Sequence, residues 1–148
     1  MSHPVTRRND PEPAEWREAV LHGAALTDAA EAASRCWACR LWQHGTQTVF
    51  GRGPRRARLM FIGEQPGDRE DLTGKPFVGP AGRILDTALE AAGLCCRTTY
   101  LTNVVKHFSW QLRGKRRVHQ KPEADEIRAC FPWLEAELAA NSRNWWSA

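Results

Sequence analysis

The chain has 148 residues, enough for one domain. Hydrophobic residues make up 42% and charged residues 26% of it, which excludes a wholly disordered or fibrous protein. No run approaches the roughly 18 to 20 apolar residues of a membrane span, and the N-terminal arginines precede no apolar stretch of a secretory signal. We therefore expect a soluble, cytoplasmic protein.

The net charge is only +4, but the basic residues are concentrated in two clusters. The first cluster contains Arg52, Arg55, Arg56 and Arg58. The second contains Arg113, Lys115, Arg116 and Arg117. Two basic loops on a small domain suit a polyanion such as nucleic acid, although basic loops can also be merely solvated.

The first part of the chain is predicted to be a polar segment followed by a helix. Residues 1–11 are polar, and we expect them to be disordered. Residues 13–34 are rich in Ala, Glu and Leu, and Pro13 suits a helix start, so one long helix is predicted there. Residues 48–50 are predicted to form a short strand.

The rest of the chain alternates strands and helices. Continuous apolar runs at residues 59–62 and 100–105 predict two buried parallel strands. Apolar residues at helical spacing predict helices over 81–92 and 123–140. This order indicates a parallel α/β architecture. Loops 64–79 and 106–121 follow the strands, so we expect them to face each other across one site.

Five cysteines are an odd number, which argues against a disulfide framework in a reducing compartment. Cys36 and Cys39 form a C-x-x-C pair, whose spacing lets both thiolates reach one metal or cluster. A thioredoxin-like redox pair would belong at a strand-to-helix turn, whereas this pair follows the predicted long helix. We therefore favour metal or iron–sulfur ligation.

The loop after the first strand carries the most specific motif. It reads G-E-Q-P-G-D-R-E-D over 63–71 and G-K-P-F-V-G-P-A-G over 74–82, and glycines of this kind let backbone approach a ligand closely. Together with residues 100–106, these strings resemble the signature of the family 4 uracil-DNA glycosylases. The string G-K-R-R-V-H over 114–119 resembles a loop insertion of the UdgX subgroup. The resemblance covers roughly residues 34–140.

The resemblance implies a three-layer α/β/α sandwich with a parallel central sheet and an iron–sulfur cluster. By position, Cys36, Cys39 and Cys130 match cluster ligands. His107 stands where the family has a further cysteine, and imidazole can replace thiolate on iron, so a [4Fe–4S] cluster with three Cys and one His is expected. The adjacent cysteines 95 and 96 match no ligand position.

The resemblance also assigns the substrate-binding residues. Phe77 matches the aromatic residue that stacks on a uracil flipped out of DNA, and Asn103 matches the amide that pairs with its polar edge. Glu64, Gln65 and Asp68 match the loop that positions and stabilises the reacting sugar.

The loop insertion would supply the nucleophile. In UdgX-like proteins its histidine, here His119, attacks C1′ of the sugar and stays bonded to the DNA. Lys115, Arg116 and Arg117 would hold the surrounding phosphates. Without the resemblance, K-R-R-V-H indicates a nucleic-acid patch or a localisation-like tract.

The C-terminus departs from the family, which continues for two more strands and a His-Pro-Ser type motif. We expect a domain over residues 12–140 that lacks its C-terminal strands, followed by an aberrant tail over 141–148. Codons for residues 144–146, read two bases later, encode Leu-Val, which suggests a frameshift near Ala140. Sequencing the gene tests this hypothesis.

The sequence therefore predicts a monomeric uracil-DNA glycosylase of the UdgX type that acts on uracil-containing, single-stranded DNA and forms a covalent His119–DNA adduct. Two alternatives stay open. One is a non-catalytic iron–sulfur module that holds single-stranded DNA through Phe77, Trp110 and the basic loops. The other is a degraded fragment inactivated by truncation.

Overall fold

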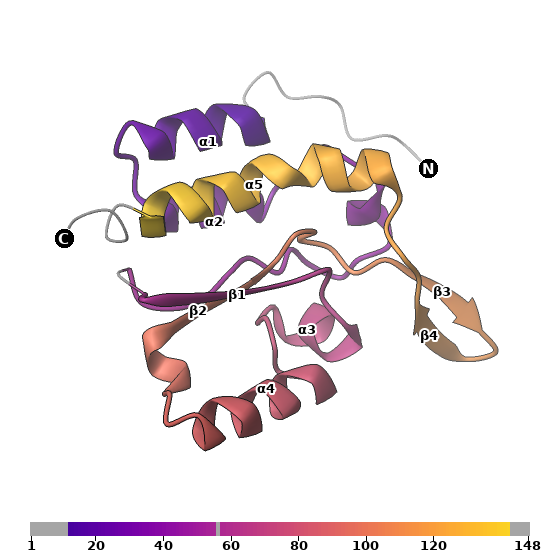
Figure 1. The fold of residues 1–148 in the computed structure, drawn as a ribbon. Helices are drawn as coiled ribbons and strands as arrows, with labels where there is room; N and C mark the ends of the chain where they lie inside the picture. Colours follow the sequence, from indigo (N-terminus) through magenta and orange to yellow (C-terminus); the bar gives the residue numbers. More distant parts are fainter. Residues whose placement is uncertain (1–11, 56, 143–148) are drawn as a thin grey trace.

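The structure is a computed structural model that describes residues 12–55 and 57–142. Two parallel strands lie between a layer formed by helices α1, α2 and α5 and a layer formed by α3 and α4 (Figure 1). The predicted α/β fold is thus confirmed. In chain order the elements are α1 (Pro13–Leu21), α2 (Leu26–Ala33), η1 (Arg40–Gln43), β1 (Leu59–Gly63), α3 (Asp68–Thr73), α4 (Pro80–Ala91), η2 (Cys96–Thr98), β2 (Thr99–Asn103), β3 (Trp110–Arg113), β4 (Arg116–His119) and α5 (Ala124–Ser142).

Three predictions about local structure were wrong. The expected helix over 13–34 is two helices, because Gly23 adopts a φ of +107° that ends α1 and turns the chain. Residues 48–50 form no strand and are held by a bond from Val49 N–H to the Lys106 carbonyl. The loop over 106–121 contains the antiparallel hairpin β3–β4.

The expected tail begins later than predicted. Residues 141 and 142, which were assigned to it, complete α5. Residues 1–11 and 143–148 lie outside the described residues.

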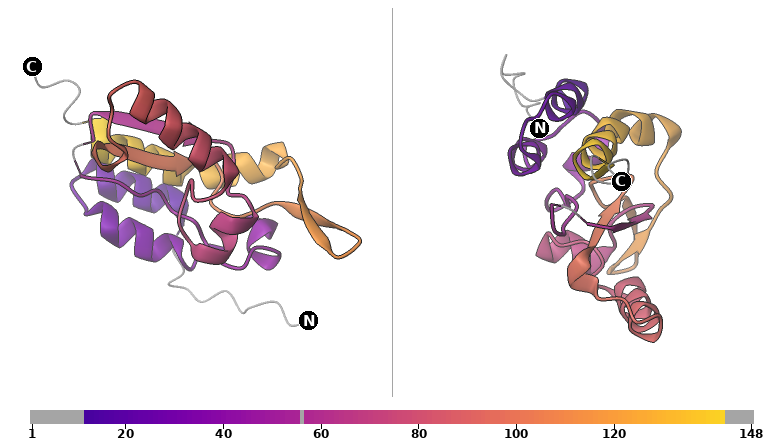
Figure 2. Two further views of the ribbon diagram at one scale, coloured as in Figure 1. Left: turned by 90° about the horizontal axis from the view of Figure 1, so that it is seen from below. Right: turned by 60° about the vertical axis from the view of Figure 1, so that its left-hand side comes forward.

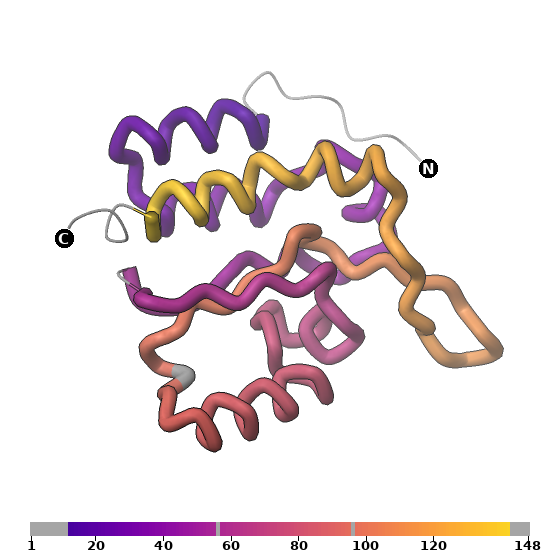
Figure 3. Tube along the Cα trace, in the orientation of Figure 1, coloured from indigo at the N-terminus to yellow at the C-terminus, as the bar shows by residue number. Residues whose placement is uncertain are grey.

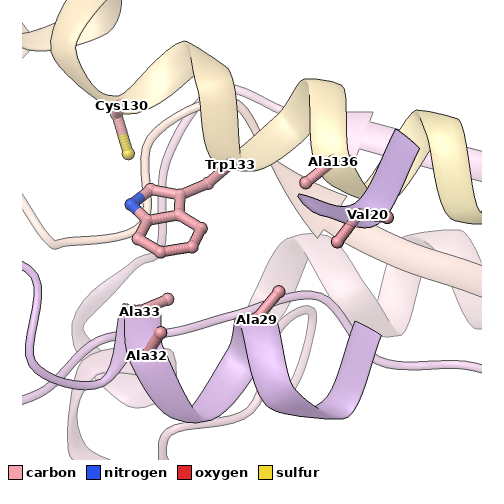
Figure 4. Close-up of a cluster of buried hydrophobic side chains, with 7 residues drawn as sticks. All are labelled: Val20, Ala29, Ala32, Ala33, Cys130, Trp133 and Ala136. Carbon is pink, nitrogen blue, oxygen red and sulfur yellow. The ribbon is translucent and has the colours of Figure 1, made fainter. Parts of the chain in front are cut away.

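The helical layer has a core built around one large side chain. Trp133 of α5 is fully buried and belongs to one cluster with small residues of α2 and with Val20 of α1 (Figure 4). Small side chains let three helices approach closely enough to enclose an indole. The members of this cluster are Val20, Ala29, Ala32, Ala33, Cys130, Trp133 and Ala136.

The loops that follow β1 and β2 begin on the same side of the molecule. β1 and β2 pair in parallel from Leu59 opposite Thr99 to Gly63 opposite Asn103. Both strands therefore end at the same edge, and the chain beyond β2 continues into the projecting hairpin (Figures 2 and 3). This arrangement confirms that the two expected loops leave one sheet edge, as ligand-binding loops do in parallel α/β folds.

A buried polar network joins β2 to α5. The Lys106 ammonium contacts the Glu137 carboxylate and donates to Thr102 Oγ1 at 2.7 Å and to the Asn103 carbonyl at 2.5 Å. Tyr100 donates its hydroxyl to the same carboxylate at 2.6 Å, and burial followed by that negative charge raises the pKa of Tyr100. Each buried charge thus has partners, which fixes the end of β2 against α5.

None of the helices in the described ranges is both long and apolar enough to cross a bilayer.

Candidate active site

The Phe77 ring and the Asn103 amide both lie next to Gly63, where the two parallel strands end, and we call this place the slot. Gly63 is opposite Asn103, and a Cβ at Gly63 would collide with the Asn103 amide oxygen and lie 3.1 Å from the Phe77 ring. Only glycine therefore lets this ring and this amide meet. Asn103 is 4% exposed. An aromatic face beside an amide is suited to a flat ring with a hydrogen-bonding edge.

Phe77 reaches the slot in an unusual conformation. Its φ is +56°, in the left-handed region that bulky residues rarely occupy. Gly82, in the first turn of α4, allows this bend because a Cβ there would collide with the Phe77 carbonyl. The loop therefore holds Phe77 in a strained backbone conformation, which is typical of a functional position.

Gln65 joins the loop after β1 to the hairpin. Its side-chain oxygen accepts a bond from Ser109 N–H at 2.7 Å, and its Nε2 donates to the Gln120 carbonyl at 2.8 Å. Ser109 precedes β3 and Gln120 follows β4. A single amide therefore closes the base of the hairpin on both sides.

His119 and Glu64 face each other across the two loops. His119 ends β4 opposite Trp110, and its Nε2 lies 3.8 Å from Glu64 Oε1. Their side chains are 58% and 50% exposed, so both are open to solvent and to a ligand. Glu64 directly follows Gly63, so the pair lies next to the slot.

Arg117 lies between two acids and two aromatic rings. Its guanidinium pairs with Asp68 at 2.6 Å and with Asp71 at 2.7 Å, and it lies over the rings of Phe108 and Trp110. Desolvation lowers the pKa of Arg117, but hydrogen bonds to Asp71 and Asp68 outweigh it and raise that pKa. Arg117 therefore fastens the hairpin to α3, whereas its neighbours Lys115 and Arg116 are exposed.

Asp71 is a buried residue of this site for which the sequence predicts no role. Its side chain is fully buried, and its second oxygen accepts a bond from Thr46 N–H at 2.8 Å. Asp71 is part of the quoted glycine-rich motif, so the motif itself carried the available signal. Its partner Arg117 lies 46 positions further along the chain, a pairing that no local pattern predicts.

The four proposed cluster ligands line one small cavity. Cys36, Cys39, His107 and Cys130 meet there, although they come from the α2–η1 connection, the β2–β3 connection and helix α5. No three Cys, His, Asp or Glu side chains in the described ranges are arranged to hold a single metal ion. In a [4Fe–4S] cluster each ligand would bind a different iron, so the four side chains need not converge on a single metal ion. Cys95 is exposed and is not among the lining residues.

The protonation of these donors reflects their burial. Burial raises the pKa of the Cys130 thiol to about 12 and also raises that of Cys39. Burial lowers the pKa of His107 to about 4, so its imidazole is neutral near pH 7. Buried thiols of this kind ionise when a cationic metal group replaces their protons, and a neutral imidazole is ready to coordinate.

Two of the cysteine sulfur atoms accept hydrogen bonds. Trp133 donates its indole N–H to Cys36 Sγ at 3.3 Å, and the Lys106 amide donates to Cys130 Sγ at 3.2 Å. His107 Nε2 lies 3.0 Å from the Thr48 hydroxyl, which itself donates to the Ala33 carbonyl. Donors to sulfur and a fixed imidazole are the outer contacts that iron–sulfur ligands use, so this donor set fits such a cluster.

Ligands of parallel α/β folds bind at the carboxyl ends of the strands, and this is where Gly63, Phe77 and Asn103 lie together. Residues 50–145 match the family model of the uracil DNA glycosylase superfamily. The match covers most of the chain, which therefore belongs to that superfamily.

The chain is also similar to individual members of this superfamily. The chain is 39% identical over 110 residues to the Type-4 uracil-DNA glycosylase of Saccharolobus solfataricus, covering 74% of this chain and 48% of that protein. It is 41% identical over 104 residues to the Type-4 uracil-DNA glycosylase of Sulfurisphaera tokodaii, covering 70% and 44%. The Type-5 uracil-DNA glycosylase of Thermus thermophilus is 31% identical over 129 residues, covering 83% and 53%. The chain spans about half the length of these relatives.

Proposed function

We propose that this chain is a uracil-DNA glycosylase of the UdgX type, which excises uracil from single-stranded DNA and bonds His119 to the abasic sugar. The observation that carries the proposal is the His119–Glu64 pair, 3.8 Å apart, beside the slot formed by Gly63, Phe77 and Asn103. The superfamily match and the names of the Type-4 relatives support the same substrate.

Uracil would enter the slot after leaving the base stack. The Phe77 ring stacks on the face of the base, and the Asn103 amide accepts from N3–H and donates to O4. The buried position of Asn103 strengthens both hydrogen bonds because little water competes for them. The sugar then lies outside the slot, towards Glu64 and His119.

The bond change is a substitution at C1′. The electron pair of the glycosidic bond leaves with uracil, and positive charge develops on the sugar. A neutral His119 nitrogen donates its lone pair to C1′ and becomes a substituted imidazolium. The Glu64 carboxylate, 3.8 Å from His119 Nε2, would stabilise the positive charge on the sugar and then on this imidazolium.

The hairpin holds both the nucleophile and the DNA. Lys115 and Arg116 are exposed near its turn and would bind phosphates. Gln65, Asp68 and Arg117 fasten the hairpin to the rest of the site, so they position His119.

We also propose that Cys36, Cys39, His107 and Cys130 hold a [4Fe–4S] cluster. Its role would be structural, since it would join the α2–η1 connection, the β2–β3 connection and α5 at one point. The Lys106 and Trp133 N–H groups would then stabilise the thiolates by hydrogen bonds.

The direct test is denaturing gel electrophoresis after mixing the protein with uracil-containing single-stranded DNA. An SDS-resistant shifted band that needs both uracil and His119 supports the proposal. His22→Ala, at an exposed histidine that follows α1, is the matched control for His119→Ala, and thymine DNA is the substrate control.

Other results of this test would support a different function. Free uracil without a shifted band indicates a hydrolytic glycosylase and overturns the covalent step. DNA binding without excision indicates the non-catalytic module. Absence of binding and of cooperative melting indicates a fragment that has lost the activity.

A further inference from the structure

Glu70 of α3 is a buried acid whose partners are backbone amides. Its side chain spans the glycine-rich loop, accepting from Gly67 N–H on Oε2 at 3.1 Å and from Gly79 N–H on Oε1 at 3.0 Å. The residue is 7% exposed, and within the described ranges its carboxylate has no cationic partner. An ionised carboxylate that accepts from two backbone amides makes charge-assisted hydrogen bonds with both.

These two amides belong to the starts of two helices. Gly67 precedes α3 and Gly79 precedes α4, so Glu70 ties together two helix N-termini, where negative charge is favourable. The glycines also leave room for the carboxylate. A Cβ at Gly67 would lie 2.8 Å from Oε2, and one at Gly79 would lie 3.1 Å from Oε1.

The loop closed by Glu70 contains Phe77, two residues before Gly79. Phe77 keeps a left-handed φ of +56° that its side chain disfavours, so surrounding contacts must maintain it. On one side Gly82 leaves space for the Phe77 carbonyl, and on the other the Gly79 amide is bound to Glu70. Loss of the latter bond would let the backbone at residues 77–79 relax and move the ring from Gly63.

We infer that Glu70 is a positioning residue for uracil recognition. Its carboxylate holds Phe77 in the left-handed conformation that places the ring against Gly63 and Asn103. This inference rests on the proposed function, in which Phe77 stacks on the base. Glu70 acts through the loop and does not itself touch the substrate.

The test compares Glu70→Gln with Glu90→Gln, a matched change at an exposed position of α4. Glutamine keeps the size but has one acceptor oxygen, so one of the two amide bonds is lost. We expect the uracil-DNA concentration for half-maximal adduct formation to rise about tenfold. The maximal rate should change less than about twofold, because the reacting groups are untouched. Glu90→Gln should match the wild type.

A second measurement follows the loop itself. In glycine-labelled protein, the Gly79 amide proton should exchange slowly in the wild type, and its resonance should shift in Glu70→Gln but not in Glu90→Gln. This measurement needs no DNA. It therefore tests the Glu70 contact even if the variant has low activity, and the wild-type exchange rate tests it even if the variant does not fold.

Three results would overturn the inference. They are an unprotected Gly79 amide in the wild type, an unchanged half-saturating concentration in Glu70→Gln, and a loss confined to the maximal rate. A wild type that does not distinguish uracil from thymine DNA would instead refute the proposed function. The Gly79 measurement separates the two failures.

Discussion

The two faces of this small domain are held together by different kinds of contact. On the helical face, Trp133 and the Lys106–Glu137 pair are buried, and the four proposed cluster ligands meet at one cavity. On the loop face, the hairpin with His119 is attached by the amide of Gln65 and the guanidinium of Arg117. The helical face is therefore held by buried contacts, whereas the hairpin that carries His119 is held by a few polar contacts, some of them exposed.

The largest effect should follow removal of a cluster ligand. Cys130→Ser should abolish stable iron–sulfur binding, because a buried ligand at the meeting point of α5 and β2 is lost. Iron and acid-labile sulfide content, with visible absorption, measures the result. Cys95→Ser changes an exposed cysteine outside the cavity and is the control. Equal iron content in both variants would refute the ligand assignment.

The buried ion pair should give the next largest effect. Glu137→Ala leaves the Lys106 ammonium buried without its carboxylate, and we expect a loss of about 3–5 kcal/mol in unfolding free energy. Denaturant unfolding by circular dichroism measures it. Glu135→Ala, on the same helix, breaks a partly exposed pair with Arg17 and should cost about 0–1 kcal/mol. Similar losses would contradict the contrast between buried and exposed contacts.

On the loop face, Arg117→Ala should lower the free energy of unfolding and slow the formation of the adduct. Asp71 would stay buried without its cation, which costs about 1–3 kcal/mol, and the loosened hairpin should slow adduct formation at saturating DNA. Denaturant unfolding and single-turnover gels measure these effects. A variant that only weakens DNA binding would show that Arg117 contacts phosphate instead.

The smallest effect should come from its exposed neighbour. Arg116→Ala should leave the unfolding free energy unchanged, within about 0.5 kcal/mol. It should reduce the slope of log binding constant against log salt by about 0.7, the value for one phosphate contact on a single strand. Fluorescence anisotropy over a salt series measures the slope. An unchanged slope would place Arg116 away from the DNA.

The pattern of apolar residues was enough to predict the strands β1 and β2 and the helices α4 and α5, because hydrophobic periodicity is a local property. The prediction that both strands are buried was wrong for β1, in which Leu59 and Ile62 are 37% and 44% exposed, whereas β2 is buried throughout. The resemblance predicts that His119, Phe77 and Asn103 belong to one site, although no local pattern links them. The local pattern predicted one helix where the chain forms α1 and α2, because one glycine among alanines is a weak signal until its φ is known.

Only the tertiary structure decided which charges pair and which face solvent. Lys115, Arg116 and Arg117 are adjacent and chemically similar, yet packing directs only Arg117 to Asp68 and Asp71. The structure likewise directs Glu70 to two amides and leaves Glu64 exposed beside His119. The sequence by itself determined most of the helices and strands and the candidate residues. The partners of those residues depend on segments far apart in the chain, whose approach is set by packing rather than by local pattern.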